Sequence, residues 1–487
     1  MPAGCPSGAG TPASPVAEEQ EKPHRINSHT KLALALFYTE VSMSYAAAID
    51  QLNSLVPELH TSPGQPRRKF SLDEMRILLG ALGDPQSHFP SVLIAGTNGK
   101  GSTAATLASI LIASGLRTGL YTSPHLTRVN ERICLNKKEI SDEDFAELFF
   151  RVRDTALRLV DEGRLPQHPS FFEILTAIAF LYFDEAGIEI AVLEVGMGGR
   201  LDATNVVSPL LSVITDISLD HMEWLGGTIA AIAREKAGIL RPSGTLITLP
   251  QHPDANQVFG EVTAELRART VLATPYLPPC GSPAAGLYQV SLPGGPLLVD
   301  SPLIGSHQHR NLALAIAAAV ELAQNHGLPI SPSTIAAGIS QTQWPGRLEH
   351  VKKNGVDWIL DVAHNSAGAS ALRDGLASLF KEDKAGSRRS LIFSCLRDKP
   401  AAEMARTLFP LFDRVILAPI RSPRATPLAD LLAVAQSAVT PAVAVESVAE
   451  ALQLAETETQ GGVVVICGSV YLVGEARPLL ATSGVEP

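Results

Sequence analysis

The sequence predicts an α/β protein with two lobes. The first is an N-terminal P-loop-type domain with a mostly parallel sheet flanked by helices, and the second is a smaller C-terminal α/β domain of Rossmann-like type. Short apolar segments alternate with helical segments, a pattern typical of parallel sheets covered on both faces. A glycine-rich turn joins one such strand to a helix, and the same alternation resumes after a break near residue 330.

The composition agrees with a globular fold. Of the 487 residues, 45% are hydrophobic and 18% are charged, which excludes a disordered chain. The formal net charge of −10 indicates no broad basic surface, so we expect no nucleic-acid partner, and an anionic substrate needs a local cluster of cations or a metal. No apolar run reaches the roughly 18 residues that a membrane span requires. The five cysteines are scattered without a CxxC pair, which favours a reduced, cytoplasmic compartment.

We expect three segments along the chain. Residues 1–40 open with small, polar and Pro-rich sequence and are predicted to form a disordered tail. Residues 41–330 are predicted to form the nucleotide-binding lobe, and residues 331–487 the second lobe. The break between them is expected at LPISPST (328–334) or slightly later, around Trp344-Pro345-Gly346. The expected elements of the first lobe are helices over 45–55, 72–82, 103–115, 171–187, 228–240 and 309–327, strands over 91–96, 117–123, 188–196 and 209–218, and an antiparallel appendage within 280–305. Strands over 356–365, 389–396, 413–419 and 461–469 are expected in the second lobe.

The turn GTNGKGS, Gly96 to Ser102, lies between a predicted strand and a predicted helix. Its glycines allow backbone N–H groups around Asn98, Gly99 and Gly101 to converge on phosphate oxygens, and the helix N-terminus adds a positive dipole. Lys100 would neutralise phosphate charge and Ser102 could bind magnesium. The sequence of this loop departs from the usual phosphate-loop motif, since a glycine separates Lys100 from Ser102. The alternative is a tight turn with an exposed lysine.

This loop and five later motifs resemble the folylpolyglutamate synthase family of the Mur ligases, including bifunctional members that are also dihydrofolate synthases. The resemblance extends from about residue 45 to the C-terminus. The later motifs are YTSPHLTRVNERI (121–133), LEVGMGGRLDATNVV (193–207), SLDHMEWLG (218–226), REKAGI (234–239) and DVAHN (361–365).

The resemblance implies an ATP-dependent amide ligase that adds L-glutamate to a folate, and to dihydropteroate if the chain is bifunctional. The γ-phosphoryl group of ATP converts a carboxylate into an acyl phosphate, which the glutamate amine attacks, so positioning and charge neutralisation carry the catalysis. The family implies two Mg²⁺ sites and a monomer. One alternative is a peptidoglycan-precursor amino-acid ligase, but the segment before the loop is too short for its extra domain. The other is a non-catalytic nucleotide-binding relative, which predicts loss of functional residues that are all present here, namely Lys100, Glu194, Lys236 and Asp361.

Glu194 is the strongest candidate for a metal ligand. It ends a predicted buried strand, where ligands of parallel sheets bind, and its carboxylate is a hard oxygen donor of the kind magnesium prefers. From the residue alone, a glutamate capping a neighbouring turn is equally reasonable. The resemblance assigns metal binding to Glu194, Ser123 and His221, together with Ser102 of the loop. Thr122 takes the place of Ser123 if the register slips by one, and chemistry alone favours a hydrogen-bonded histidine at His221, since imidazole is an unusual ligand for magnesium.

The resemblance also implies that Lys236 is carbamylated by carbon dioxide and then resembles a carboxylate ligand of the second magnesium. Only a neutral amine reacts, so the lysine must be buried with a lowered pKa. The alternative is a solvated lysine paired with Glu235 or with a neighbouring helix carboxylate.

Further residues are assigned to the substrates by resemblance. A bidentate Arg132 suits the carboxylate of the incoming glutamate. An aromatic wall and a carboxylate suit a pterin ring, although aromatic residues at a helix start are more often core residues. The residues expected near the pterin are Phe171, Phe172, Glu173, Arg200 and Asp202.

The nucleotide and glutamate sites draw on both lobes. By resemblance, Asn311 contacts adenine or ribose, Arg347 a phosphate, and Asp361 the ribose, while His364 binds glutamate and joins Lys100 and Lys236 as a catalytic residue. The family usually has glycine where this chain has Val362. Contacts divided between two lobes imply that the lobes close before chemistry and exclude water.

Overall fold

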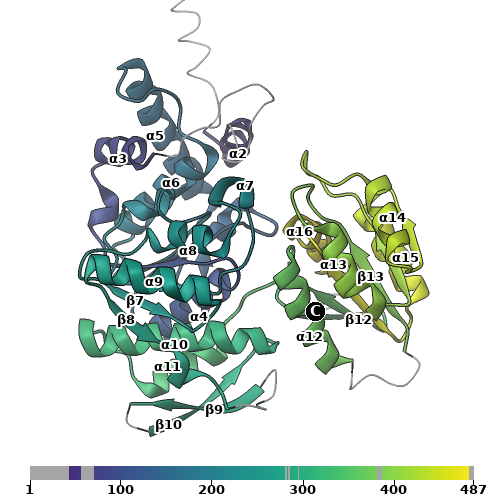
Figure 1. The fold of residues 1–487 in the computed structure, drawn as a ribbon. Helices are drawn as coiled ribbons and strands as arrows, with labels where there is room; N and C mark the ends of the chain where they lie inside the picture. The colour runs from purple at the N-terminus through teal and green to yellow at the C-terminus, as the bar shows by residue number, and fades with distance from the viewer. Residues whose placement is uncertain are drawn as a thin grey trace, which may run out of the picture.

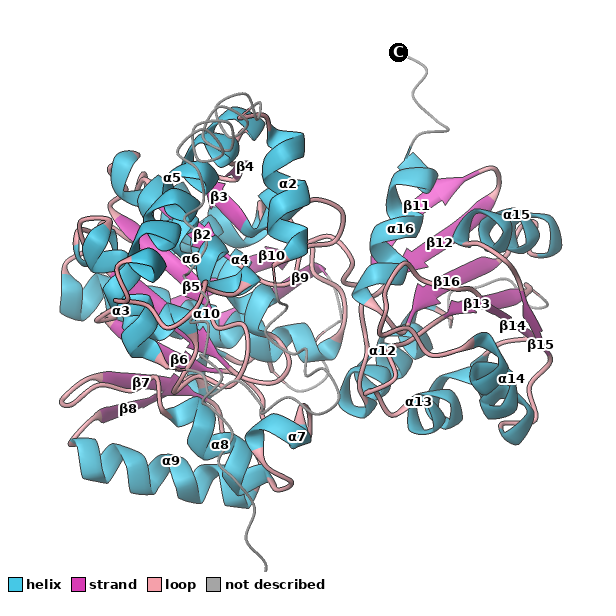
Figure 2. Cartoon of the chain, turned by 90° about the horizontal axis from the view of Figure 1, so that it is seen from above, coloured by secondary structure: helices cyan, strands magenta, loops and turns pink. Residues whose placement is uncertain are grey.

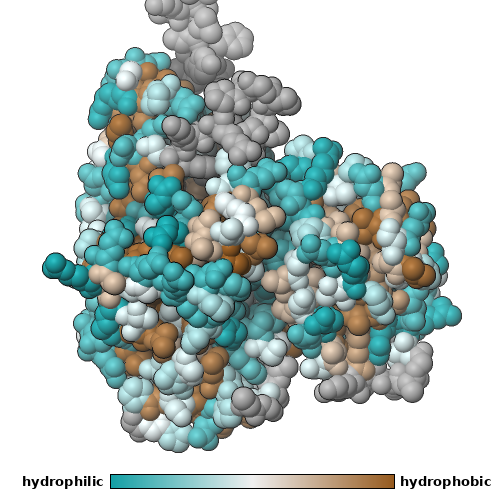
Figure 3. Space-filling view, in the orientation of Figure 1, coloured by the Kyte–Doolittle hydropathy of each residue, from teal (hydrophilic) through white to brown (hydrophobic). Residues whose placement is uncertain are grey.

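The computed structural model describes residues 43–55, 71–279, 282, 286–293, 295–380 and 387–481. The expected tail over residues 1–40 lies outside the described residues. The chain forms two lobes, each with its own sheet, and a linker joins them (Figure 1). Within the described residues no helix combines the length and apolar character that a membrane span needs. Figure 3 shows hydrophilic residues over much of one face, interrupted by smaller apolar patches on both lobes.

The first lobe is built on an eight-stranded sheet with the order β4-β3-β2-β5-β1-β6-β7-β8. The six strands from β2 to β8 in that order are mutually parallel, and β3 and β4 add an antiparallel edge. Strand β1 lies centrally between β5 and β6, so the loops that follow these three strands meet at one edge. The strands are β1 (Ser91–Ala95), β2 (Thr118–Tyr121), β3 (Ile133–Leu135), β4 (Lys138–Glu139), β5 (Ile190–Glu194), β6 (Leu211–Ile214), β7 (Thr245–Thr248) and β8 (Arg269–Leu272).

Two apolar cores cover the two faces of this sheet. One core includes residues of α2, α3, α5, α6, α8 and α9, and the other includes residues of α4, α10 and α11. The helices are α2 (Tyr45–Ser54), α3 (Leu72–Ala81), α4 (Lys100–Ala113), α5 (Asp142–Asp161), α6 (Phe171–Glu185), α7 (Met222–Leu225), α8 (Ile229–Ala237), α9 (Pro253–Leu266), α10 (Ser306–His326) and α11 (Pro332–Ser340). The expected antiparallel appendage is confirmed as the hairpin of β9 (Gly286–Leu292) and β10 (Gly295–Ser301).

Helix α11 lies at the boundary between the lobes, which the sequence places at residue 331 or slightly later, around residues 344–346. Helix α11 packs on α4, where the Ser109 hydroxyl donates a 2.6 Å hydrogen bond to the Gly338 carbonyl. The first lobe therefore extends to Ser340. The Pro- and Ser-rich segment suggested a break because it starts a helix: Ser331 caps α11, and Pro332 occupies its first turn.

The second lobe has a six-stranded sheet with the order β11-β12-β16-β13-β14-β15, and only β11 is antiparallel. Helices α12, α13 and α14 cover one face, and α15 and α16 cover the other (Figure 2). The expected second α/β sheet is confirmed. Its elements are β11 (Glu349–Lys353), β12 (Val356–Leu360), α12 (Ser366–Leu379), β13 (Arg389–Phe393), α13 (Ala401–Leu408), β14 (Arg414–Leu417), α14 (Leu428–Ser437), β15 (Ala442–Ala444), α15 (Val448–Glu458), β16 (Val463–Cys467) and α16 (Val470–Ala481).

Candidate active site

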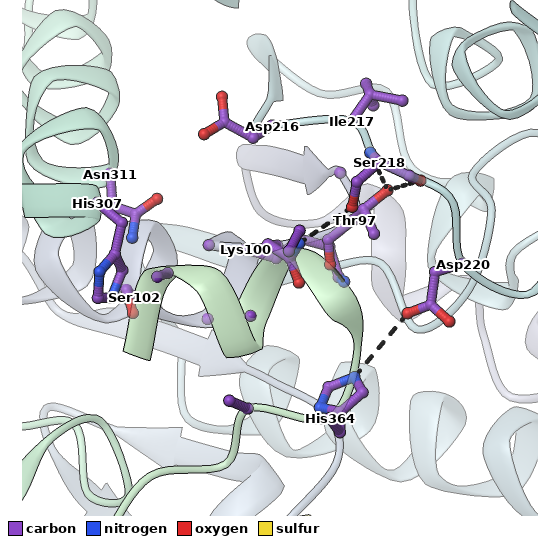
Figure 4. A pocket seen from close by; sticks show the side chains of 18 of the residues that line it. Thr97, Lys100, Ser102, Asp216, Ile217, Ser218, Asp220, His307, Asn311 and His364 are labelled. Carbon is purple, nitrogen blue, oxygen red and sulfur yellow. Dashed lines mark hydrogen bonds and ion pairs between the residues drawn. The ribbon is translucent and has the colours of Figure 1, made fainter. Parts of the chain in front are cut away.

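A cavity of about 550 Å³ lies where the two lobes meet (Figure 4). The first lobe supplies the loops after β1, β5 and β6 and the start of α10. The second lobe supplies the loop after β12 and the first turns of α12. Many of the expected site residues line this cavity: Asn98, Gly99, Lys100, Gly101, Ser102, Ser123, Glu194, His221, Lys236, Asn311, Arg347, Asp361 and His364.

The phosphate loop is held open by its backbone conformation and by β6. Gly99 precedes α4 with φ of 88°, in the left-handed region that favours glycine, and a Cβ there would lie 2.1 Å from Asn311 Oδ1. The Thr97 N–H donates to the Asp216 carbonyl at 2.9 Å, and the Thr97 hydroxyl donates to the Ser218 carbonyl at 3.1 Å. These bonds orient the first turn of α4 so that its N–H groups, which have no acceptor within the helix, face the cavity.

Lys100 and Ser102 follow in the first turn of α4. The Lys100 ammonium donates to the Thr97 carbonyl at 3.3 Å, which folds the side chain back over the loop. The Ser102 hydroxyl is buried at the cavity wall. This arrangement places a cation and a hydroxyl beside the N-terminus of a helix, as phosphate binding requires.

The glycine that departs from the usual phosphate-loop pattern has a structural role that was not predicted. A Cβ at Gly101 would lie 2.6 Å from Cζ2 of Trp344, a residue of the linker between the lobes. The linker therefore packs directly on the phosphate loop. Sequence reasoning missed this contact because the two residues are far apart in the chain, and neither predicts the other.

Glu194 ends β5 inside the cavity and is only 4% exposed. Burial raises the pKa of its carboxyl group, while the charge of Lys100 and a 3.1 Å hydrogen bond from the Ser123 N–H act against this. The carboxylate would therefore gain from a nearby cation. In the described part of the chain, no three His, Cys, Asp or Glu side chains converge as a metal cluster. The hard oxygen donors that fit magnesium here are Glu194 and Ser102 or Ser123, and phosphate oxygens and water would supply further ligands.

His221 lies in the same cavity, in the loop after β6. Burial lowers the pKa of its imidazole to about 4, although the charge of Asp220 opposes this. The ring is therefore neutral near pH 7, which is the form that binds metals.

Lys236 is 4% exposed, and its ammonium donates a 2.7 Å hydrogen bond to the Gly96 carbonyl at the start of the phosphate loop. Burial and then the nearby charge of Lys100 lower the pKa of Lys236 to about 7. A solvated lysine paired with Glu235 is not what the structure contains, because Glu235 pairs with Arg200 at 2.9 Å. Lys236 has the burial and the neutral fraction that carbamylation requires.

The aromatic segment at the start of α6 is placed mainly in the core. The Phe172 ring is buried, and a Cβ at Gly196 would lie 2.6 Å from its Cζ. Glu173 completes a capping box, in which the Ser170 N–H donates to Glu173 Oε2 at 2.7 Å. The segment 171–173 is not among the residues that line the interlobe cavity in the described chain.

Arg132 also lies outside the lining of this cavity in the described chain. Its guanidinium lies 5.3 Å from the centre of the Phe171 ring, and its Nε donates to His125 Nδ1 at 2.9 Å. Arg132 and Phe171 are therefore in contact, as neighbouring positions in one substrate site would be, but the structure leaves their role a prediction.

Asp202 and Arg200 lie beside a smaller cavity of about 110 Å³. The buried Asp202 carboxylate accepts hydrogen bonds from the Met197 N–H at 3.0 Å and the Thr204 N–H at 3.0 Å, so it organises the glycine-rich loop after β5. Burial raises its pKa, and the Thr204 hydroxyl opposes the shift.

In the second lobe, Asp361 follows β12 and is buried. It accepts hydrogen bonds from the Leu348 N–H at 3.0 Å and the Ala363 N–H at 2.8 Å. Burial raises its pKa, and the charge of Arg347 opposes this. Burial lowers the pKa of Arg347, and the charges of Asp361 and Glu194, one carboxylate from each lobe, oppose the shift.

His364 and Val362 complete the same loop. His364 Nδ1 donates to the Val362 carbonyl at 2.8 Å, and burial lowers the pKa of this histidine to about 4. The Val362 N–H donates to the Gly346 carbonyl at 3.0 Å, and the side chain is buried in an apolar cluster. Valine at this position therefore leaves Asp361 and His364 at the cavity.

Comparisons with known proteins agree with this geometry. Residues 94–273 match the Mur ligase middle domain, and residues 346–470 match the Mur ligase glutamate ligase domain. The folylpolyglutamate synthase of Lacticaseibacillus casei is 35% identical, with 85% of this chain and 96% of the relative covered. The dihydrofolate synthase/folylpolyglutamate synthase of Bacillus subtilis is also 35% identical, with 85% and 95% covered.

Solved structures show the same architecture. The Mycobacterium tuberculosis folylpolyglutamate synthase complexed with ADP and AMPPCP has a TM-score of 0.79 and 33% identity, covering 85% of this chain and 96% of that chain. Escherichia coli FolC in complex with DHPP and ADP has a TM-score of 0.76 and 29% identity, covering 90% and 97%. With a phosphate loop, a buried glutamate and a buried lysine meeting a second lobe at one cavity, the chain belongs to the folylpolyglutamate synthase family of the Mur ligases.

Proposed function

We propose that this protein is an ATP-dependent carboxylate–amine ligase that adds L-glutamate to a folate. The observation that carries the proposal is the convergence of Lys100, Glu194 and Lys236 of one lobe with Arg347 and Asp361 of the other on one cavity. A nucleotide gripped by the phosphate loop would have its terminal phosphate between the cations of both lobes. Solved relatives hold ADP and AMPPCP, which supports nucleotide binding here.

The reaction needs the chain to bring three anionic substrates together. A carboxylate oxygen of the folate attacks the γ-phosphorus, ADP leaves, and the acyl phosphate forms. The neutral amine of glutamate then attacks the acyl carbon, the bond from that carbon to the phosphate oxygen breaks, and the departing phosphate takes up the proton that the amine loses as the amide forms. Lys100 and Arg347 neutralise the transferred phosphoryl group, and closure of the second lobe excludes water that would hydrolyse the acyl phosphate.

We further propose two magnesium sites, held by Ser102, Ser123, Glu194 and His221 and by carbamylated Lys236. Magnesium supplies charge neutralisation for the phosphates when bound. The buried Glu194 carboxylate, the neutral imidazole of His221 and the lowered pKa of Lys236 support these assignments. His364 and Arg132 are assigned to glutamate, the segment 171–173 with Arg200 and Asp202 to the pterin, and Asn311 with Asp361 to the nucleoside.

We propose that the protein also acts as a dihydrofolate synthase, as a cytoplasmic monomer. Dihydropteroate reacts at its benzoate carboxylate and a folate at the γ-carboxylate of its glutamate. One phosphoryl-transfer site can serve both if the pterin of dihydropteroate occupies a second pocket. The Bacillus subtilis relative bears both names, and the Escherichia coli structure holds DHPP, which supports the proposal.

A substrate panel tests the function. Purified protein is incubated with MgATP and radiolabelled L-glutamate, and with dihydropteroate, tetrahydrofolate or neither, and products are separated by chromatography. We expect labelled product and phosphate release only when both glutamate and a pterin substrate are present. Lys100→Ala should reduce both by a factor of about 10³ or more. Glutamate incorporation at the wild-type rate by Lys100→Ala would contradict the proposal. Labelled product with tetrahydrofolate but none with dihydropteroate would show that the protein is not a dihydrofolate synthase.

A further inference from the structure

A cluster of polar side chains joins the two lobes beside the cavity. Its centre is Asp220, in the loop between β6 and α7 of the first lobe, and its other members come from the second lobe. Lys399 Nζ lies 2.7 Å from Asp220 Oδ1, Asn365 Nδ2 donates to Asp220 Oδ2 at 3.2 Å, and His364 Nε2 lies 3.9 Å from Oδ2. Figure 4 shows Asp220 and His364 facing each other across this junction.

The cluster is connected to the phosphate loop. The Asn365 side-chain amide that reaches Asp220 also donates to Asn98 Oδ1 at 3.0 Å. Asn365 is itself held in place as the N-cap of α12, where its Oδ1 accepts a 2.8 Å hydrogen bond from the Gly368 N–H. A change in how the lobes meet at Asp220 therefore changes contacts of the phosphate loop.

The central ion pair is enclosed. The side chain of Lys399 is 5% exposed and that of Asp220 is 11% exposed. Lys399 precedes α13 and is not among the residues that line the cavity in the described chain. The Asp398 carboxylate also lies near the Lys399 ammonium, but at a longer distance of 3.9 Å. Separation of the lobes would break the pair across the junction and return both charges to water, so the contact belongs to the arrangement in which the lobes meet.

We propose that the Asp220–Lys399 pair is an ionic latch for the closed arrangement, and that Lys399 is a positioning residue of the ligase. A contact made in only one of two arrangements shifts the equilibrium toward that arrangement. The Lys399 ammonium pairs with the Asp220 carboxylate across the lobes. The same carboxylate accepts from Asn365, whose amide also donates to Asn98 of the phosphate loop. Removal of one partner leaves the other charge enclosed and unpaired in the closed arrangement, which disfavours that arrangement. The effect on catalysis rests on the proposed function, but the effect on closure does not.

The test compares Lys399→Met and Lys399→Arg with wild type, and uses Lys352→Met as the matched control. Lys352 belongs to the same lobe, has a side chain 80% exposed, and pairs with Asp357 at 3.6 Å on the surface. Closure is measured in the full chain by small-angle X-ray scattering and by single-molecule energy transfer between labels on the two lobes, with and without Mg²⁺ and AMPPCP. Thermal melting checks that each variant is folded.

We expect Lys399→Met to lower the closed fraction with AMPPCP and to reduce kcat by about tenfold or more, because misplacement of reacting groups is costly. Lys399→Arg should recover most of both losses, and Lys352→Met should match wild type. An unchanged closed fraction in folded Lys399→Met would overturn the proposal, and a loss of kcat without that shift would instead place Lys399 in the chemical step. If wild type shows no glutamate ligation, the closure measurement still decides the latch, so the two failures can be told apart.

Discussion

Gly101 illustrates how a single residue couples the phosphate loop to the linker. It lies in the first turn of α4, and the ring of Trp344 occupies the space that a side chain would need. The glycine between Lys100 and Ser102 is therefore explained by packing of the linker as well as by access of phosphates to the backbone.

Gly101→Ala should lower the free energy of unfolding by about 1–3 kcal/mol, as overpacking commonly does. Urea denaturation of the full chain measures the change. Gly260→Ala is the matched control, since Gly260 also lies in a helix and an added Cβ has no atom within 4 Å. That variant should gain about 0.5–1 kcal/mol through helix propensity alone. Equal effects of the two substitutions would contradict the contact with Trp344.

The ionisation of Lys236 determines whether this lysine can be carbamylated. We expect a carbamate signal in ¹³C NMR after addition of labelled bicarbonate, growing between about pH 6 and about pH 8 at fixed carbon dioxide, because burial lowers the pKa of Lys236 to about 7 and only the neutral amine reacts. The signal should be absent from Lys236→Met and present in Lys352→Met. A signal that survives in Lys236→Met would assign the carbamate to another lysine.

The same pKa has a consequence for stability in the unmodified protein. The folded pKa of Lys236 is about 7 and the ordinary value is 10.5, so between these values the unfolded chain binds more protons than the folded one. This group therefore destabilises the protein at low pH, and its contribution to the free energy of unfolding rises with pH across that window. Urea titrations without carbon dioxide should show a shallower rise for Lys236→Met than for wild type.

At the scale of elements, Glu173 at the start of α6 caps this helix and is also expected to contact the pterin. Glu173→Ala should cost about 1 kcal/mol of unfolding free energy, because it removes the partner of the Ser170 N–H in the capping box. Glu173→Gln should retain most of this cap. Urea denaturation measures both. A rise in the KM for the folate in Glu173→Gln, with stability unchanged, would show that the carboxylate also contacts the pterin.

The elements that the sequence predicted well are those with a strong local signal. Strands β1, β5 and β16 are short apolar runs buried at every position. Helices α4 and α10 are long runs of helix-forming residues, buried over most of their length, that end close to Gly115 and Gly327. Helix α5 was not predicted, although Phe145, Phe149 and Val152 recur on one buried face and Ser141 caps it. The short strands β3 and β4 have almost no pattern of their own and exist because they pair at the edge of the sheet.

At the scale of the whole molecule, the cavity exists only because two lobes meet. Arg347 shows this most directly, since the carboxylates that act on its pKa come from both lobes, Asp361 from its own and Glu194 from the other. An arginine in this position can bind a phosphate, and the charges around it depend on whether the two lobes are closed.

Arg347→Ala should weaken AMPPCP binding about tenfold or more, which is the loss of one or two hydrogen bonds to a charged group. Isothermal titration calorimetry with Mg²⁺ present measures the affinity. Arg421→Ala is the matched control, because Arg421 belongs to the same lobe and its side chain is 93% exposed. The AMPPCP-induced rise in melting temperature should shrink in Arg347→Ala alone. An unchanged affinity of Arg347→Ala for AMPPCP would show that Arg347 does not bind the nucleotide.

The sequence by itself determined the two α/β lobes, the phosphate loop and the family, because strand–turn–helix patterns and contiguous motifs are local. It also identified Lys100, Glu194 and Lys236, each of which lies within such a motif. It offered two positions for the lobe boundary, near residue 331 and near residue 344, and did not decide between them, since the cap of α11 resembles a linker until its packing on α4 is known.

Only the tertiary structure decided which residues meet. Trp344 on Gly101, Lys399 on Asp220 and Asn365 on Asn98 join segments separated by long stretches of chain. The burial that lowers the pKa of Lys236 is likewise produced by surrounding elements. Contacts between lobes depend on the shape and charge of two assembled surfaces, and no local pattern along the chain encodes that match.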